Sequence, residues 1–196
     1  MQIHYEDDKV IVVNKAPGDD SEKLAASLGV YVVHRLDMPV SGLIIYAKTK
    51  DVASSLTRQI QEGLFEKEYI AYLSANEDKI TTPLEEEGRL VDLLLWDRNK
   101  RKSFVVNSKR GGVKEASLRY KILGTSTAAD GTKLTKVRVK LETGRTHQIR
   151  VQFSSRGYPL AGDGKYGSKV KGRLELYSCR IACTVGNKPM EFVLEA

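Results

Sequence analysis

Short segments of strand-type sequence, separated by turn residues, recur along the chain and limit its fold more than any other feature. Five such segments are rich in β-branched and aromatic residues and lie at 10–13, 43–47, 65–73, 118–123 and 134–141. No apolar run exceeds five residues, so no segment is expected to span a membrane or act as a signal peptide. The pattern predicts an α+β fold with a mixed, mostly antiparallel β-sheet and a few flanking helices.

Three helices are predicted from capping residues and apolar periodicity, over residues 21–28, 49–62 and 146–155. The first two are followed by Gly29 and Gly63, and a glycine commonly ends a helix in the left-handed conformation. Residues 30–33 are apolar and β-branched and predict a buried strand or an extended segment. The stretch 76–117 is polar and irregular, which predicts hairpins and loops. The tail predicts two closing strands, over 174–185 and 190–194.

The charges are divided unevenly along the chain. Residues 1–97 hold 10 Lys and Arg against 18 Asp and Glu, a net charge of −8, whereas residues 98–196 hold 22 against 7, a net charge of +15. The densest basic run is Arg98-Asn99-Lys100-Arg101-Lys102. A basic half is typical of proteins that bind a polyanion, so RNA or DNA is an expected partner and a merely solvated face is the alternative. Few aromatic residues are interleaved with the basic runs, so base stacking is not predicted there.

Cys179 and Cys183 are the only cysteines. Two are too few for a disulfide framework, and no second pair completes a zinc site. We therefore expect a cytoplasmic protein without a metal.

A polar interruption, His34-Arg35-Leu36-Asp37, lies between two apolar segments. A carboxylate between buried strands costs free energy unless it is paired or used in chemistry. Asp37 is therefore a candidate catalytic residue, and the alternative is a structural ion pair with a nearby arginine.

A second unusual run is Gly144-Arg145-Thr146-His147-Gln148-Ile149-Arg150. On a helix His147 and Arg150 would share a face, and a surface pair of the two is one interpretation. The apolar neighbours of Arg150 favour another, a semi-buried guanidinium that needs a carboxylate. Neither Arg150 nor Asp37 has another obvious partner in the sequence.

Two further segments hold candidate residues. Lys67 and Tyr69 share one face of the strand expected at 65–73, where a tyrosine commonly serves packing. Residues 157–167 contain four glycines and predict a shaped loop, but they lack the spacing of a nucleoside-triphosphate loop.

Together with Ser41-Gly42-Leu43, these runs occur in the order and at the spacing of the RluA-type pseudouridine synthase family, which the chain resembles from residue 3 to residue 194. The resemblance implies the pseudouridine synthase catalytic fold and isomerisation of a specific uridine to pseudouridine in ribosomal or transfer RNA. It implies one catalytic domain over residues 1–196, without a separate N-terminal RNA-binding domain. The reaction requires no cofactor, and a monomer is the default expectation.

The resemblance also implies roles for individual residues. Asp37 would be the catalytic residue that acts on a flipped-out nucleotide, with Arg150 as its charge partner. Tyr69 would pack against the target base and take part in proton removal. The expected substrate-binding residues are Arg35, His34, Leu36, Arg145 and His147.

Two other functions stay open at this point. An inactive RNA-binding or ribosome-assembly factor would keep the same fold, although the presence of Asp37, Tyr69 and Arg150 argues against it. A glycosidase would need two carboxyl groups at a fixed separation, and only Asp37 stands out.

Overall fold

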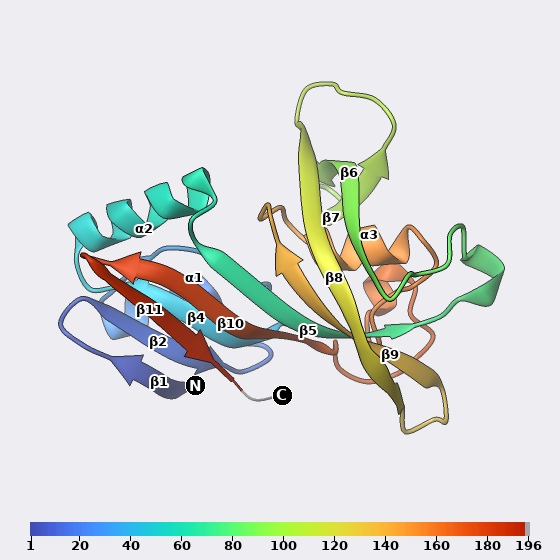
Figure 1. The fold of residues 1–196 in the computed structure, drawn as a ribbon, viewed down its shortest axis with the longest axis horizontal. Coiled ribbons are helices and arrows are strands. Elements are labelled where there is room, and N and C mark those ends of the chain that lie inside the picture. Colours follow the sequence, from blue (N-terminus) through green and yellow to red (C-terminus); the bar gives the residue numbers. More distant parts are fainter. Residues whose placement is uncertain (195–196) are drawn as a thin grey trace. The chain divides into compact units, whose positions relative to one another are not determined.

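The structure, a computed structural model, describes residues 1–194, which form two compact units (Figure 1). Unit 1 contains Met1–Tyr69 and the chain from Tyr177 onward, and unit 2 contains Ile70–Leu176. Strand β5 (Glu66–Ser74) belongs to both, because the boundary between the units falls between Tyr69 and Ile70.

Unit 1 is a sheet with two helices. In addition to β5, its elements are β1 (Gln2–Glu6), β2 (Val10–Lys15), α1 (Ser21–Leu28), β3 (Tyr31–Val32), β4 (Ser41–Ala47), α2 (Lys50–Glu62), β10 (Leu176–Val185) and β11 (Lys188–Val193). The strands pair in the order β1-β2-β4-β10-β5, with β3 also on β4 and β11 also on β10. The β4–β10 pair is parallel, and β1–β2, β2–β4, β3–β4 and β10–β11 are antiparallel.

Both faces of the unit 1 sheet are covered. On one face, alternate residues of the strands, such as Val12 and Ile45, form a buried cluster with Leu56 of α2. On the opposite face Tyr46 is fully buried, and its hydroxyl donates to the Ser21 carbonyl at the start of α1 at 2.9 Å. Because neither face meets water, residues 43–47 form a continuous apolar run in place of an alternating one.

Unit 2 is built on a second run of antiparallel strands. In addition to the end of β5, its elements are η1 (Glu77–Lys79), β6 (Glu87–Asp97), β7 (Lys102–Val106), β8 (Val113–Thr127), β9 (Lys133–Leu141), α3 (Gln148–Ser154) and η2 (Gly164–Tyr166). The strands pair in the order β5-β9-β8-β6-β7. Val151 of α3 packs with Leu94 and Ala116, so the helix lies against β6 and β8. Within residues 1–194, no helix is long and apolar enough to cross a membrane.

The predicted mixed, mostly antiparallel sheet is confirmed, and so are the first two helices. Asp20 accepts hydrogen bonds from the amides of Glu22 and Lys23, and Gly29 ends α1 in the left-handed conformation. Thr49 and Gly63 act in the same way at the two ends of α2.

The hairpin predicted within residues 76–117 is confirmed by the antiparallel β6–β7 pair, but more of this stretch is strand than expected, since it also contains the start of β8. These strands alternate weakly, since much of their surface is exposed. Residues 30–33 contain the short strand β3, but the expected burial is wrong, because both residues of β3 are exposed. Helix α3 begins at Gln148 and not at Thr146, because His147 takes a left-handed φ of 55°.

Gly42 lies where β4 meets β10, and a side chain there is expected to separate the two strands. A Cβ atom at this position would lie 2.2 Å from the Ser178 carbonyl oxygen, and φ is +105°. We expect Gly42→Ala to lower the free energy of unfolding by about 3 kcal/mol, from overpacking and backbone strain together. The matched control is Gly167→Ala, where φ is +91° and nothing lies within 4 Å of the added atom. Urea unfolding that gives equal losses for the two variants would contradict this account.

Candidate active site

Asp37 lies half-buried in the loop between β3 and β4, and the residues on both sides of it are anchored. The Ser21 hydroxyl accepts from the Leu36 amide at 3.2 Å and donates to the Leu36 carbonyl at 3.1 Å. The Met38 carbonyl accepts from Lys15 Nζ at 3.1 Å and from the Gly18 amide at 2.7 Å. These bonds fix the path of the backbone that carries the carboxylate.

Lys15 is a fully buried cation at the end of β2. In addition to the Met38 carbonyl, its Nζ donates to the carbonyls of Ala16 at 2.9 Å and Asp19 at 3.0 Å. Burial lowers the pKa of Lys15, and the negative charges of Asp19, Asp37 and Asp20 oppose this shift. Lys15 was not among the predicted site residues, although a lysine two residues after the apolar run 10–13 was a signal for a buried, satisfied cation.

Tyr69 is buried on β5. Burial raises the pKa of its phenol strongly, and the negative charge of Asp37 raises it further. The phenol is therefore neutral at physiological pH. Unit 1 thus brings Asp37 close enough to Tyr69 and to Lys15 for its negative charge to affect the pKa of both.

The other predicted residues of this loop differ in exposure. Arg35 is exposed and its guanidinium lies 2.8 Å from the Glu22 carboxylate in an exposed ion pair. His34 and Leu36 are buried. His34 Nε2 faces the Ile45 amide at 3.4 Å, and burial followed by the nearby charge of Lys67 lowers the pKa of His34 to about 3. Contact of these three residues with RNA stays a prediction.

In unit 2, Arg150 forms a buried, two-pronged ion pair with Asp163. Arg150 Nε donates to Asp163 Oδ2 at 2.7 Å, and Nη2 donates to Oδ1 at 2.8 Å. The side chains are 6% and 1% exposed. The guanidinium also lies 5.0 Å from the centre of the Tyr166 ring.

This ion pair corrects the argument that Arg150 has no obvious partner other than Asp37. Asp163 is that partner, and the sequence analysis noted it only as part of a glycine-rich loop. The expected pairing of Arg150 with Asp37 rests on the family resemblance alone. The signal for Asp163 was an acidic residue between two glycines, in a loop that follows the helix of Arg150 by a few residues.

The backbone before Asp163 requires a glycine. Gly162 has φ +75°, and a Cβ atom there would lie 1.8 Å from the Arg173 carbonyl oxygen. The preceding residue, Ala161, donates to the Tyr72 carbonyl at 2.7 Å and accepts from the Glu175 amide at 2.9 Å. The glycine-rich loop therefore places a carboxylate for Arg150.

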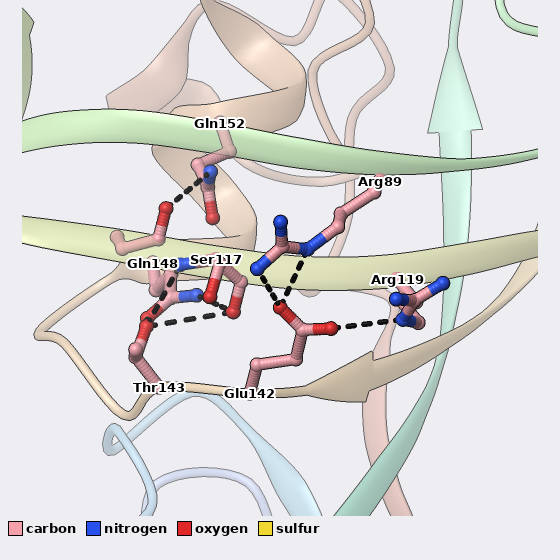
Figure 2. A network of polar contacts seen from close by, with 8 residues as sticks. Arg89, Ser117, Arg119, Glu142, Thr143, Gln148 and Gln152 are labelled. Atoms are coloured by element: carbon pink, nitrogen blue, oxygen red, sulfur yellow. Dashed lines mark hydrogen bonds and ion pairs between the residues drawn. The ribbon is translucent and has the colours of Figure 1, made fainter.

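Hydrogen bonds of the Gln148 side-chain amide hold the start of α3 against β8. Figure 2 shows Gln148 between Thr143 and Ser117. Gln148 Oε1 accepts from the Thr143 hydroxyl at 2.8 Å and from the Arg145 amide at 3.0 Å, and Nε2 donates to the Ser117 carbonyl at 3.0 Å. The same figure shows Glu142 accepting from Arg89 and Arg119 on the exposed side of the strands.

The remaining predicted residues lie on either side of this bend. Arg145 is exposed, and its Nε donates to the Glu115 carbonyl at 2.9 Å. His147 is half-buried, with Nδ1 2.9 Å from the Tyr166 hydroxyl. Unit 2 thus brings together His147, Tyr166, Arg150 and Asp163. Among residues 1–194 there is no group of three His, Cys, Asp or Glu side chains arranged to hold a metal ion.

Comparison with known proteins decides the family. The profile described as RNA pseudouridylate synthase matches residues 6–155. The chain belongs to this family. It is an RNA pseudouridine synthase of the RluA type, which is an isomerase.

Individual pseudouridine synthases agree with this assignment. The chain is 32% identical over 217 residues to the dual-specificity RNA pseudouridine synthase RluA of Yersinia pestis, covering 100% of this chain and 99% of that protein. It is 31% identical to RluA of Vibrio parahaemolyticus, covering 92% and 76%. It is also 31% identical to the ribosomal large subunit pseudouridine synthase D of Nitrosomonas europaea, covering 85% of this chain and 50% of that protein.

A solved structure supports the fold. Human RNA Pseudouridylate Synthase Domain Containing 1 has a TM-score of 0.85 at 24% identity, covering 100% of this chain and 83% of that one. The predicted pseudouridine synthase fold is therefore confirmed.

Removal of the Asp163 charge should destabilise the synthase strongly. Asp163→Asn leaves the buried Arg150 guanidinium without its paired carboxylate, and we expect a loss of about 3 kcal/mol in the free energy of unfolding. The matched control is Glu22→Gln, which breaks the exposed pair with Arg35 and should cause no measurable change. Urea denaturation of the two variants checks this, and a small loss at both positions would contradict it.

His34 should make the stability depend on pH. Its pKa is about 3 in the folded protein, against about 6.5 in an unfolded chain, so unfolding takes up a proton below pH 6.5. The free energy of unfolding should therefore fall as the pH drops from about 6.5 toward 3, by up to about 1.4 kcal/mol per pH unit from this residue. His34→Gln should show a shallower slope between about pH 6 and pH 5 in thermal or urea unfolding. An equal slope in both proteins would show that His34 is not a buried neutral histidine.

Proposed function

We propose that the protein isomerises a specific uridine in ribosomal or transfer RNA, with Asp37 acting on a flipped-out nucleotide. The names of the similar proteins, dual-specificity RluA and large subunit synthase D, support these two classes of RNA. The observation that carries the role of Asp37 is its double anchoring, through Leu36 on one side and Met38 on the other. A half-buried carboxylate on a fixed backbone is held in one position, as a reaction at a single atom of the ribose requires.

The chemistry asks for one ionised carboxylate and no external reagent. The bond between the ribose and N1 of uracil breaks, the base turns, and a carbon–carbon bond forms at C5. The proton lost from C5 is balanced by the proton gained at N1, so the product is an isomer. Asp37 would act by covalent attack on the sugar or by removing a ribose proton on a glycal route.

Tyr69 and Arg150 complete the proposed catalytic group. The raised pKa of Tyr69 keeps its phenol protonated, so the ring would pack against the base and its hydroxyl would donate a hydrogen bond. Asp163 orients the Arg150 guanidinium through Nε and Nη2. We propose, as the family resemblance implies, that Arg150 balances the charge of Asp37 during the reaction.

Arg35 is suited to occupy the space that the flipped base leaves. Its guanidinium forms an exposed ion pair with Glu22, and such pairs contribute little stability. Exchange of Glu22 for an RNA phosphate or base edge would therefore cost little. Flipping the base costs a few kcal/mol, and less from a loop than from a duplex.

Mapping pseudouridine across total RNA, in cells that lack the gene and carry a variant, tests this function. We expect the wild-type chain to restore a modified site and Asp37→Asn to reduce its formation by about 10³-fold or more, because the amide neither attacks nor accepts a proton. The matched control is Asp51→Asn, an exposed carboxylate in the first turn of α2, which should restore the site fully.

Other outcomes would change the assignment. Full activity in Asp37→Asn, with its folding verified by circular dichroism, would remove Asp37 from the mechanism. Identical RNA with and without the gene would favour an inactive RNA-binding protein.

A further inference from the structure

A turn between β6 and β7 carries a dense group of cations. Arg98, Lys100 and Arg101 are exposed, and Lys102 begins β7. The Asp97 carboxylate accepts from the Lys100 amide at 2.9 Å, which stabilises the turn. We call residues 98–102 the cationic turn.

Two aromatic residues flank the cationic turn, Trp96 before it and Phe104 after it. Trp96 lies opposite Ser103 in the β6–β7 pair and is 36% exposed. The Nζ atoms of Lys100 and Lys102 lie 5.4 Å and 5.6 Å from the centre of the Phe104 ring. These two rings flank the cationic turn in the sequence, so they give a reason to reconsider base stacking at this turn.

Hydrogen bonds from Ser103 connect this hairpin to the bend before α3. The Ser103 amide donates to the Tyr166 hydroxyl at 2.9 Å, and its hydroxyl donates to the Thr146 carbonyl at 2.6 Å. The Trp96 and His147 rings meet edge to face, with centres 5.3 Å apart. The hairpin is thus fixed to Thr146 and His147, which precede α3, and to Tyr166, which follows it.

The Tyr166 side chain lies between the β6–β7 hairpin and Arg150 and contacts both. Its hydroxyl lies 2.9 Å from His147 Nδ1. Lys102 Nζ lies 4.7 Å from the centre of its ring, and the Arg150 guanidinium lies 5.0 Å from it. Trp96 and the cationic turn therefore lie beside the proposed catalytic arginine within one compact unit.

Backbone strain is concentrated at this surface. Within residues 1–194, the non-glycine residues with positive φ are Arg101, at 47°, and His147, at 55°. Such conformations cost free energy and are enriched where function requires a particular side chain. Arg101 keeps a cation at the tip of the turn, and His147 supports the ring of Trp96.

We propose that Trp96 stacks against an unpaired base of the RNA substrate while the cationic turn binds the adjoining phosphates. This inference rests on the proposed function, and it narrows the substrate to a uridine with a single-stranded neighbour. Every base has a π-face, so a tryptophan among cations binds single strands with little sequence preference. An acidic protein would use the cations but would leave the exposed indole without a matching partner.

Intrinsic fluorescence measures this contact directly, because Trp96 is the only tryptophan of the chain. The probes are a 12-nucleotide oligoadenylate, which contains no uridine, and inorganic polyphosphate, which has the charge but no base. We expect saturable quenching of the tryptophan emission by oligoadenylate at low salt, and binding of polyphosphate without comparable quenching.

Substitution provides the second measurement. By anisotropy of labelled oligoadenylate, Trp96→Ala should weaken binding by about 5- to 150-fold, and Trp96→Phe by less because a smaller ring still stacks. The matched control is Tyr31→Ala, which removes an aromatic ring of similar exposure on β3 and should leave the affinity unchanged.

Several results would overturn the proposal. These are the absence of saturable oligoadenylate binding to the wild-type protein, binding without a change in emission, or quenching by polyphosphate to the same extent. Since neither probe contains uridine and no reaction is followed, the result is independent of catalysis. A fully active Asp37→Asn protein that is still quenched by oligoadenylate would contradict the proposed function and leave the stacking site standing.

Discussion

The buried ammonium of Lys15 is the interaction on which the geometry around Asp37 depends. A cation without solvent must be satisfied by the protein, and here backbone carbonyls of Ala16, Asp19 and Met38 supply that satisfaction. Because these carbonyls belong to two separate loops, one side chain fixes both. The Ser21 hydroxyl does the same for Leu36, so the carboxylate between Leu36 and Met38 has little freedom to move.

Unit 2 also contains a buried cation, and here a carboxylate satisfies it in place of backbone carbonyls. Arg150 is buried on α3, and Asp163 meets its planar edge with two bonds in a geometry that a lysine would not reproduce. The Asp163 carboxylate is placed by a turn at Gly162, where only glycine fits. Gly162 therefore contributes to the electrostatics of the arginine by placing Asp163.

Local signals in the sequence predicted much of this fold. Asp20 and Gly29 around α1 are short-range features whose effect does not depend on the rest of the chain. In the stretch 76–117 only hairpins and loops could be predicted, without strand bounds, because β6 and β7 are partly exposed and alternate little. The roles of Asp37, Tyr69 and Arg150 came from family resemblance, since spacing alone left ordinary structural interpretations open.

The partners that the sequence analysis missed share one property, since each acts through contacts that depend on the folded chain. Asp163 reaches Arg150 only because a glycine turn directs it there. Ser103 and Tyr166 are far apart in the sequence and meet only when β7 is paired. Periodicity carries no information about such contacts.

The left-handed conformation of Arg101 has an evolutionary consequence. Glycine at this position would relax the backbone, so drift toward a more stable hairpin would favour replacement of the arginine. Each such replacement would also remove one positive charge from the tip of the turn. Persistence of an arginine there would therefore require selection for something other than folding.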